Sequence, residues 1–475
     1  MVRTSFPLRR AFGHALVVVA LTGCAAVGPN YREPRAITPA QWSAPMPHDG
    51  STRKLGDWWQ QFNDSVLTRL QQVAESDSPT LAAAWGNIEL ARATLASARA
   101  GATPTVSAGA SVSRARQQGV QTATVGTTRS ASADASWELD LFGKVRRNVE
   151  SADAQLQVRR NDWHDARVSL AAEVATNYVD YRTCGLLVDA YEQELVSIRQ
   201  TTAATESLAR AGLSPSTDAA LARATQASTT SSLLEQRSQC ELLVKSLTNL
   251  TGLQEPELRQ LLEGGSKSIP EAAALAIENV PADVLRQRPD VASYERDLAA
   301  ASAAIGLAQA DLYPSIKLGG SIGISATGGN SLSSWSFGPS LSIPLFDGGS
   351  RKAAVDSARA SYEIAYAQWR NAVRSAVSEV EKALVQLDKA DKRATQAERA
   401  AAEYRRYLNG AEAERRAGTI SLLTFEESRR LALSAQIELI GQQRDRVTYW
   451  IGLYKALGGG WNSQSPIAPP ASRAP

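Results

Sequence analysis

Histidines, cysteines and glycine runs are the places where this 475-residue chain could carry chemistry. His164 lies between Asp162 and Asp165, a set of side chains that could hold a metal ion, but on a polar helix such a cluster usually faces solvent. The run 458–460 of three glycines lacks the Lys-Ser/Thr continuation of a phosphate-binding loop, so we interpret it as a helix stop. No Ser-His-Asp signature and no zinc-ligand spacing occurs in the sequence. We therefore predict no catalytic residue, no metal site and no enzyme activity.

The first cysteine, Cys24, closes a short secretory signal. Three arginines precede an apolar run, Ala15 to Leu21, which is too short to cross a membrane as a helix. Leu21-Thr22-Gly23-Cys24 then matches a bacterial lipobox, whose small residues admit the signal peptidase. We predict that residues 1–23 are removed and that Cys24 carries N-acyl diacylglycerol, with no other cofactor. Two alanines follow, rather than the aspartate that favours the inner membrane; a chance cysteine is the alternative interpretation.

Length and composition narrow the class of protein. A chain of this length would ordinarily form two to four globular domains. The formal net charge of +3 is nearly balanced, so neither a nucleic-acid partner nor a field for acidic substrates is indicated. After Leu21 no apolar stretch approaches the roughly 18 to 20 residues of a membrane helix. If the mature chain crosses a bilayer, it must do so with strands.

The chain repeats itself. Three pairs of segments keep the same order at offsets of 210, 204 and 206 residues: Ala98–Pro104 with Ala308–Pro314, Leu139–Gly143 with Ile343–Asp347, and Arg210–Gly212 with Arg416–Gly418. Such nearly constant spacing indicates one internal duplication. We predict a first repeat over 57–270 and a second over 271–461. The anchored segment 24–56 precedes them, and a tail, 462–475, is expected to be disordered.

Each repeat contains two segments in which apolar and small polar residues alternate. Val106 to Val112 alternates with serine and glycine in the first repeat, and Ile316 to Ile324 does so in the second. This period of two is typical of strands with lipid on one side and water on the other. We predict strands at about 104–115, 130–141, 314–325 and 334–345, each close to the length of a tilted membrane strand. An ordinary soluble hairpin on a helical domain remains the alternative.

Long helices fill the rest of each repeat. Val145–Ala211 and Ser350–Ala417 contain no proline, and at ~1.5 Å per residue each would reach roughly 100 Å. Globular helices rarely run that far, so a coiled-coil or tubular architecture is indicated. Gly212 and Gly418 end these helices, and Ser or Thr begins the helices that return. The predicted helical hairpins span about 145–250 and 350–457.

The other two cysteines test the first hairpin. Cys184 and Cys240 each lie 28 residues from Gly212, so antiparallel helices would bring them to the same height. An oxidising periplasm favours a disulfide between them. Equal height does not make the side chains face each other, so two buried thiols that never touch are the alternative.

The sequence resembles the TolC-like outer-membrane factors, in particular the OprM/NodT lipoprotein branch, over nearly the whole mature chain. The motifs are Val27–Tyr31, Trp58-Trp59, Trp137–Gly143, Pro281–Asp290 and Tyr454–Trp461. The resemblance implies a mixed α and β membrane protein that is a homotrimer. Four strands per protomer would form a shared twelve-stranded β-barrel, continued by a periplasmic α-helical barrel with an equatorial belt. It also implies a passive exit duct in the outer-membrane lipid that works with a periplasmic membrane-fusion adaptor and an inner-membrane RND-type pump.

The resemblance implies positions for a gate. In similar proteins an aliphatic ring and an acidic ring, tied by arginine, close the periplasmic end; these places fall on Leu423, Glu427 and Arg430. Similar proteins commonly have Asp where Glu427 stands, and often an Asp where Thr424 stands. Without the resemblance, Glu427 and Arg430 would be interpreted as an exposed helical pair. The adaptor would dock at the two hairpin tips, at Arg210, Gly212, Ser214, Arg416, Gly418 and Ser421.

Two other functions stay open. The same duct could serve a type I secretion system, and a purely structural periplasmic coiled-coil lipoprotein would explain the helices but not the paired alternating segments. Within the duct, we predict that the first hairpin is the stiffer one and that the second hairpin moves at the gate.

Overall fold

The computed structural model describes residues 26–36, 38–39, 42–44, 58–118, 123–271, 285, 288–461, 466–467 and 469. Cys24 lies outside these residues, as do the predicted signal, 1–23, and most of the predicted tail. The chain divides into two compact units. The first comprises Met1–Arg35, Gly86–Arg160 and Ala292–Asn371, and the second comprises Ala36–Trp85, Asn161–Val291 and Ala372–Pro475. The mixture of long helices with one sheet confirms the mixed α and β fold.

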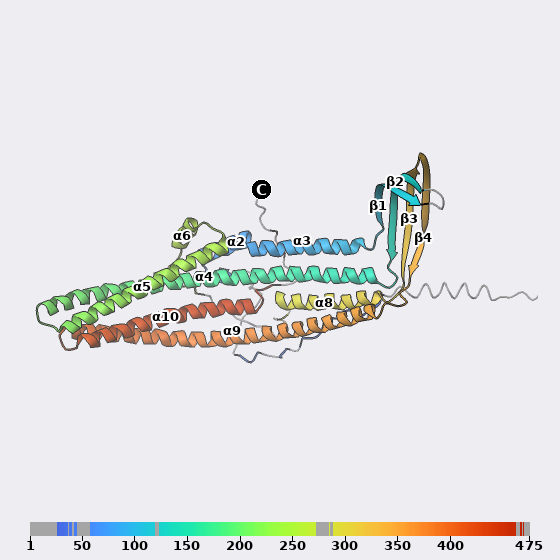
Figure 1. The fold of residues 1–475 in the computed structure, drawn as a ribbon. Helices are drawn as coiled ribbons and strands as arrows, with labels where there is room; N and C mark the ends of the chain where they lie inside the picture. The colour runs from blue at the N-terminus through green and yellow to red at the C-terminus, as the bar shows by residue number, and fades with distance from the viewer. Residues whose placement is uncertain are drawn as a thin grey trace, which may run out of the picture. The chain divides into compact units, whose positions relative to one another are not determined.

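The first unit contains an antiparallel sheet of four strands in the order β1-β2-β3-β4 (Figure 1). The strands are β1 (Thr105–Gln118), β2 (Ala123–Leu139), β3 (Ser315–Thr327) and β4 (Asn330–Ser342). β2 of the first repeat pairs with β3 of the second, so the duplicated hairpins form one sheet. Gly328 and Gly329 connect β3 to β4 with φ angles of 61° and 89°, the left-handed geometry that favours glycine in a tight hairpin.

The strands differ from the prediction at the hairpin ends. β1 continues to Gln118 and β2 begins at Ala123, although most of the polar segment between the two predicted strands was interpreted as a loop. The segment is rich in threonine, which is favoured in strands, and its backbone continues the ladder with Arg114 opposite Thr127. The Thr128 and Thr327 hydroxyls are 2.9 Å apart between β2 and β3. Polar side chains were therefore compatible with a longer strand.

Helices of the first unit pack through small residues and one buried arginine. They are α3 (Pro79–Ala100), α8 (Pro289–Ala310) and the beginnings of α4 (Lys144–Arg210) and α9 (Ser350–Arg416). Ala154, Ala299 and Ala300 form a small core with Tyr31 beside it. The Arg147 guanidinium is buried and donates to the carbonyl oxygens of Val27, at 3.0 Å, and Gly28, at 3.2 Å. The N-terminal segment is thereby fastened along the helices.

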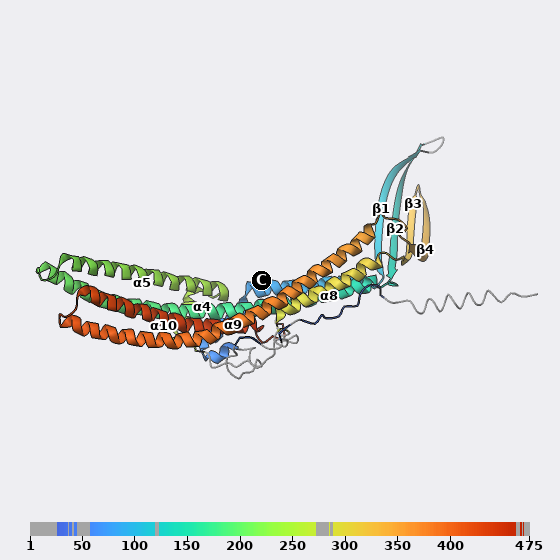
Figure 2. The ribbon, with the colours of Figure 1, turned by 90° about the horizontal axis from the view of Figure 1, so that it is seen from below.

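The second unit contains two helical hairpins, which lie side by side and turn at the same end (Figure 2). α4 turns at Gly212 into α5 (Ser216–Thr251), and α9 turns at Gly418 into α10 (Leu422–Ala456). Ser421 caps α10 by accepting from the Thr424 amide at 3.1 Å. The buried residues of α9 follow a heptad-like spacing: Trp369, Val373, Ala376, Val380, Ala383 and Leu387. None of the described helices combines the length and apolar character that crossing a membrane would require.

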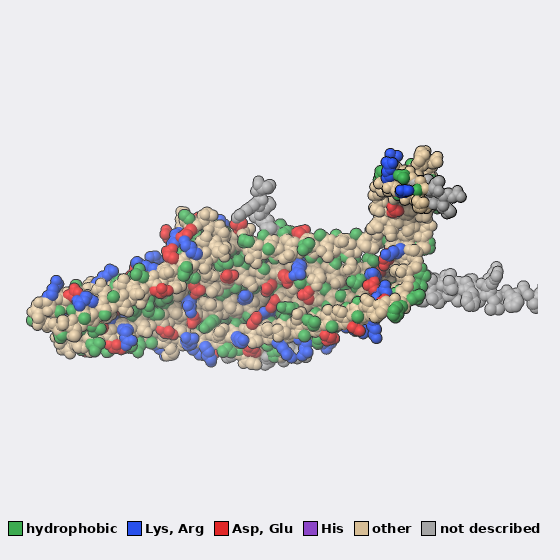
Figure 3. Space-filling model, viewed as in Figure 1, with side chains coloured by type: hydrophobic (Ala, Val, Ile, Leu, Met, Phe, Trp, Pro, Cys, Tyr) green, Lys and Arg blue, Asp and Glu red, His purple; other side chains and the backbone are tan. Residues whose placement is uncertain are grey.

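Short helices complete the core of the second unit at the base of the hairpins. α2 (Ser65–Asp77) and α6 (Glu255–Glu263) bury Leu67, Leu70 and Leu258 against the long helices. Trp58 is 1% exposed and its ring stacks on Tyr454 with 4.4 Å between centroids. The large core of the second unit therefore lies at the base of the hairpins. Acidic and basic side chains are interspersed over the helical surface (Figure 3).

Candidate functional site

The sheet has one apolar and one polar face. Strand register places Ala108, Ala133, Ile322 and Trp335 in one row across all four strands. The same face carries most of the other apolar residues of the strands and, toward the β1–β2 hairpin end, the arginines Arg114, Arg116 and Arg129; the apolar residues include Val106, Ala110, Val112, Ala131, Ala135, Trp137, Leu139, Ile316, Leu318, Ile324, Phe337 and Leu341. Trp335 is 80% exposed and Ile322 65% exposed, so nothing within the described chain covers this face. A broad apolar face of this kind fits lipid.

The opposite face is made mainly of serine, threonine and glycine, with a few charges and the two apolar residues Ala115 and Leu332. Ser111 and Ser130 exchange a hydrogen bond of 2.8 Å, and Ser321 and Ser336 do the same. Lys317 pairs across the strands with Glu138 at 3.3 Å. These groups are bonded to one another and remain accessible to water. The sheet therefore separates a lipid-compatible surface from a water-compatible one.

The first described residues lie beside the start of α4. The Val27 amide donates to the Phe142 carbonyl oxygen at 3.0 Å, and Ala26 lies so close to Gly143 that a side chain there would clash. Phe142 in turn stacks on Tyr313, with 4.7 Å between ring centroids. Residues 26 and 27 are therefore held at the connection between β2 and α4.

The predicted gate residues lie on one exposed face of α10. Leu423, Glu427 and Arg430 follow at intervals of four and three residues, which places them on the same side of the helix. Leu423 is 66% exposed within one chain. Arg430 Nη2 lies 2.6 Å from Glu427 Oε1, and both side chains are exposed. The structure brings the acidic and basic members together, with Leu423 one turn nearer the tip.

The neighbouring arginine, Arg429, points into the interface with α4 and was missed from the sequence. It is 2% exposed, and its Nη1 lies 3.0 Å from Glu426 Oε1. Across the helix interface its Nη2 donates to the hydroxyls of Ser197, at 3.1 Å, and Thr201, at 2.9 Å, on α4. Spacing could have found it, because Arg429 continues the buried series of Leu422 and Phe425 at heptad intervals.

A second carboxylate approaches the same guanidinium. Glu194 Oε1 on α4 lies 3.5 Å from Arg429 Nε. Burial raises the pKa of Glu194 to about 7; Arg429 works against that shift, and the nearby Glu426 adds to it. Burial likewise raises the pKa of Glu426. Two carboxylates therefore share one buried cation between the first and second hairpins.

The predicted docking residues lie at the two hairpin tips. Arg210, Gly212, Arg416, Gly418 and Ser421 are exposed, and Ser214 is half-buried. The Ser214 hydroxyl lies 3.1 Å from Asp218 Oδ2. Leu213, which the sequence interpretation did not select, is also strongly exposed. Both tips lie at one end of the second unit (Figure 2). Their exposed side chains include both polar and apolar residues.

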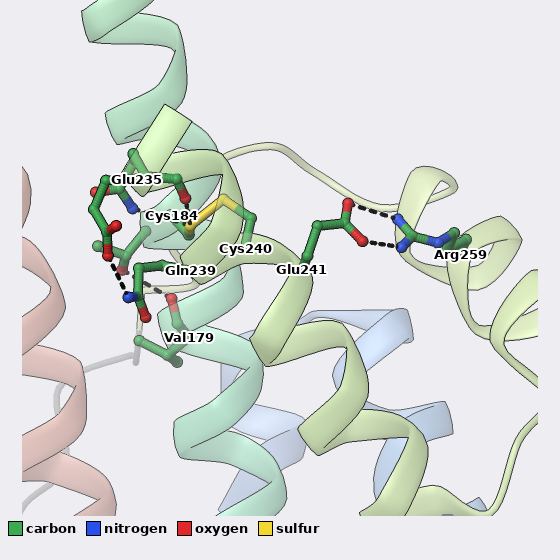
Figure 4. Close-up of a disulfide and its surroundings, with 9 residues drawn as sticks. Val179, Cys184, Glu235, Gln239, Cys240, Glu241 and Arg259 are labelled. Atoms are coloured by element: carbon green, nitrogen blue, oxygen red, sulfur yellow. Dashed lines mark hydrogen bonds and ion pairs between the residues drawn. A yellow bond between two sulfur atoms is a disulfide. The ribbon is translucent and has the colours of Figure 1, made fainter. Parts of the chain in front are cut away.

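Cys184 and Cys240 meet between α4 and α5. Their Cα atoms are 5.6 Å apart, and a disulfide joins the sulfur atoms (Figure 4). Next to Cys240, Glu241 forms an ion pair with Arg259 of α6. The first hairpin is thus fastened to itself and, one residue further, to the short helix packed beside it.

His164 and the glycines at 458–460 pack within the second unit. The polar neighbours of His164 suggested that it faces solvent, but this was wrong. His164 is buried beside the rings of Trp163 and Trp461. Burial, with Arg167 nearby, lowers its pKa to about 4. Among the described residues no group of three His, Cys, Asp or Glu side chains could hold a metal ion. Gly458 and Gly459 have φ angles of 80° and 63° and end α10.

The described end of the motif Pro281–Asp290 binds the C-terminal end of a helix. Arg288 donates to the Ala456 carbonyl oxygen at 2.9 Å, at the end of α10. Its other nitrogens bind Asp290, at 2.7 and 3.0 Å, and Glu379, at 2.7 Å. The guanidinium therefore joins the start of α8, α9 and the end of α10.

Comparisons with known proteins agree with this architecture. The model of the outer membrane efflux protein family matches residues 70–253 and 280–459. Nodulation protein T of Rhizobium leguminosarum bv. trifolii is 32% identical over 93% of this chain and 96% of its own length. The probable efflux pump outer membrane protein TtgC of Pseudomonas putida is 31% identical over 95% and 96%. The solved outer-membrane channel OprN superposes with a TM-score of 0.84 at 30% identity, over 92% of this chain and all of that one. This chain belongs to the outer membrane efflux protein family.

Proposed function

We propose that this protein is the outer-membrane channel of a tripartite, RND-type efflux system, a passive exit duct for drugs or other small molecules. One observation carries the proposal: a single chain combines an amphipathic four-stranded sheet with two long helical hairpins. The sheet suits a bilayer on one side and water on the other. The hairpins supply polar helices that can extend into the periplasm.

The open edges of the sheet support a homotrimer. β1 and β4 each have one partner strand among the described residues, so each has a free edge of backbone groups. In a bilayer such groups have no water to bind, and only a closed barrel satisfies them. Four strands are too few to enclose a passage, whereas three copies would supply twelve. In that arrangement β4 of each protomer would pair with β1 of the next.

The exposed face of α10 supports a gate at the periplasmic end. Three copies of Leu423 around an axis would form a dry constriction. Three Glu427 carboxylates at the next turn would repel one another, and Arg430, already paired with Glu427 at 2.6 Å, would reduce that repulsion. The constriction would open when the second hairpin moves.

The partners follow from the lack of a driving force in a passive duct. A periplasmic membrane-fusion adaptor would bind the exposed hairpin tips, and an inner-membrane RND-type pump would supply the energy. Relatives are named as outer membrane proteins of antibiotic and toluene efflux pumps, which supports small-molecule cargo here. The alternatives are a type I secretion duct and, with less support, a structural coiled-coil lipoprotein.

Reconstitution and complementation test the proposal together. The purified chain in planar bilayers should produce channels with a small resting conductance, and in detergent it should migrate as a heat-modifiable trimer. A deletion strain should become sensitive to several unrelated compounds and recover with the gene. Absence of both channels and trimer would leave the structural lipoprotein. Drug resistance unchanged by the deletion, together with loss of a secreted protein, would favour type I secretion.

Lipid attachment needs its own test, because Cys24 lies outside the described residues. Mass spectrometry of the mature N-terminus should find a diacylglyceryl and an N-acyl group on Cys24. Cys24→Ser should abolish both and should leave an unprocessed or unacylated chain. An unmodified mature N-terminus elsewhere would contradict the proposed anchor without touching the channel.

A further inference from the structure

Two adjacent arginines on α10 have opposite surroundings. Arg430 is exposed and pairs only with Glu427 of its own helix among the interactions described. Arg429 is buried and binds groups of both α10 and α4. Because the two side chains leave the helix in different directions, whatever holds Arg429 also determines where the face with Leu423, Glu427 and Arg430 points.

The Arg429 guanidinium has partners on several of its edges. Ser197 and Thr201 on α4 each accept a hydrogen bond from Nη2, while Glu426 accepts from Nη1 and Glu194 lies near Nε. The Phe425 ring covers the guanidinium, with 4.5 Å from the ring centroid to Cζ. A planar guanidinium with partners on several of its edges permits one rotation of α10 about its axis.

Apolar packing at this level is slight, which leaves the position of α10 to this cluster. The nearest apolar core among the described residues is small: it joins the buried Ala222, Ala411, Leu422 and Phe425, with the partly buried Leu408 and Ile420 packed against them. Beside Arg429 a groove of about 630 Å³ separates α4 from α9 and α10, lined among others by Leu408 and Leu433. Helices that pack loosely can rotate, whereas a buried charge must keep its partners.

Other charged groups surround the cluster without replacing it. Asp189 on α4 and Arg405 and Glu412 on α9 line the same groove. Arg415 of α9 acts on Glu426 from the tip side. Arg405 binds Gln436 at 2.8 Å and Glu412 pairs with Arg416, so both already have partners.

We propose that Arg429 is the positioning residue of the constriction. By binding Glu194, Ser197 and Thr201 of the first hairpin, it fixes the rotation of α10 and thereby turns Leu423, Glu427 and Arg430 toward the passage. The proposal rests on the gated duct proposed above. It makes the first hairpin the reference against which the second moves.

Single-channel recording of the full-length protein tests this role. Arg429→Ala should raise the resting conductance or the time spent open at least threefold, although all three gate residues are unchanged. Arg429→Lys should recover only part of the closure, since one ammonium cannot bind both helices in the same geometry. Glu194→Gln should also open the channel, and Glu194→Gln added to Arg429→Ala should change it no further, because both remove one interaction.

Two controls separate positioning from general loosening. Arg406→Ala removes an exposed arginine of α9 that pairs only with Glu403 among the interactions described, and it should leave conductance as in the wild type. Val447→Ala truncates a buried side chain of α10 that does not line this groove, so it should lower the melting temperature without a comparable opening. An equal opening in Val447→Ala would overturn the proposal.

The outcomes also distinguish this inference from the channel itself. If the wild type forms no channels, the proposed function fails. If it forms channels that open on Glu427→Ala with Arg430→Ala but stay closed in trimeric Arg429→Ala, only the positioning role fails. If Arg429→Ala does not assemble into trimers, the milder variant Glu194→Gln provides the test. Wild-type conductance in Glu194→Gln would then contradict the proposal.

Discussion

Removing the disulfide of the first hairpin should weaken that hairpin by a measurable amount. The perturbation is Cys184→Ser with Cys240→Ser, which keeps the size of the side chains and deletes the bond. The bond closes a loop with a sequence separation of 56 residues. Chain-entropy arguments assign a loop of this length about 4 kcal/mol of stabilisation at 25 °C.

Packing around the disulfide determines which parts of the first hairpin lose stability when the bond is removed. Below the disulfide, Tyr178, Val244 and Leu247 belong to the large core of the second unit and keep α4 against α5. Toward the tip the buried apolar residues of both helices are fewer: Leu195, Ile198, Ala219, Ala222 and Leu233. We therefore expect the free energy of opening to fall by up to about 4 kcal/mol for α5 as a whole, and by less for the tip alone.

Mass spectrometry tests whether the disulfide is present, and hydrogen exchange measures the free energy of opening of α5. Non-reducing peptide mapping should find Cys184 and Cys240 joined; two free thiols would remove the basis of the prediction. In the double variant, amides of α5 should exchange faster by up to about three orders of magnitude, since 1.4 kcal/mol corresponds to a factor of ten. Wild-type protein treated with a reductant should exchange like the variant. Unchanged exchange would mean that packing alone holds the first hairpin, and the idea of a stiffer first hairpin would be wrong.

Three further predictions concern the gate, the buried carboxylate and the sheet. Glu427→Ala with Arg430→Ala should raise single-channel conductance by removing the charged layer; an unchanged conductance would refute the gate assignment. The pKa of Glu194 is about 7 in the folded chain against an ordinary value of 4.5, so the folded state binds the proton more tightly. The free energy of unfolding should therefore fall by up to roughly 3 kcal/mol between pH 4.5 and pH 7, and Glu194→Gln should flatten that slope in urea titrations. Ile322→Lys on the apolar face should cost about 2–4 kcal/mol per protomer and reduce the heat-modifiable trimer, whereas Ser321→Lys on the polar face should not; equal losses would show that the faces were assigned wrongly.

The alternation of side chains was enough to predict where strands lie, but not where they end. Val106 to Val112 and Ile316 to Ile324 carry the period of two that a two-faced sheet requires. The threonines at the hairpin end carry no apolar signal, so they were interpreted as loop although Thr128 extends the ladder and bonds to Thr327. Hydrogen bonds between backbones hold those positions, and backbone groups leave no trace in hydropathy.

Counting residues from the hairpin glycine was enough to put Cys184 and Cys240 at one height. Whether they face each other depends on the rotation of two helices, which spacing does not fix. The gate residues came from resemblance, since an exposed pair such as Glu427 and Arg430 is common on helices. Arg429 and His164 were missed or misjudged for one reason: a polar side chain on a long helix suggests solvent, and only packing reveals that it is buried.

Buried arginines explain how such helices are joined with little apolar interior. The described chain buries four, Arg147, Arg182, Arg288 and Arg429. Each binds a segment distant in sequence: the carbonyls of Val27 and Gly28, of Leu262, of Ala456, and the hydroxyls of Ser197 and Thr201. A guanidinium has five donors in one plane, so it can satisfy a loop or a helix end while its aliphatic stem packs against apolar surface.

This arrangement has a consequence for mutation. A buried cation that loses a partner costs several kcal/mol, whereas an exposed ion pair is worth little. Sensitivity along the chain should therefore follow the burial of its arginines rather than their number: Arg429 and Arg288 should matter far more than exposed Arg406. Lysine should substitute poorly at the buried places, because one ammonium cannot bind Ala456, Asp290 and Glu379 in the plane that Arg288 uses.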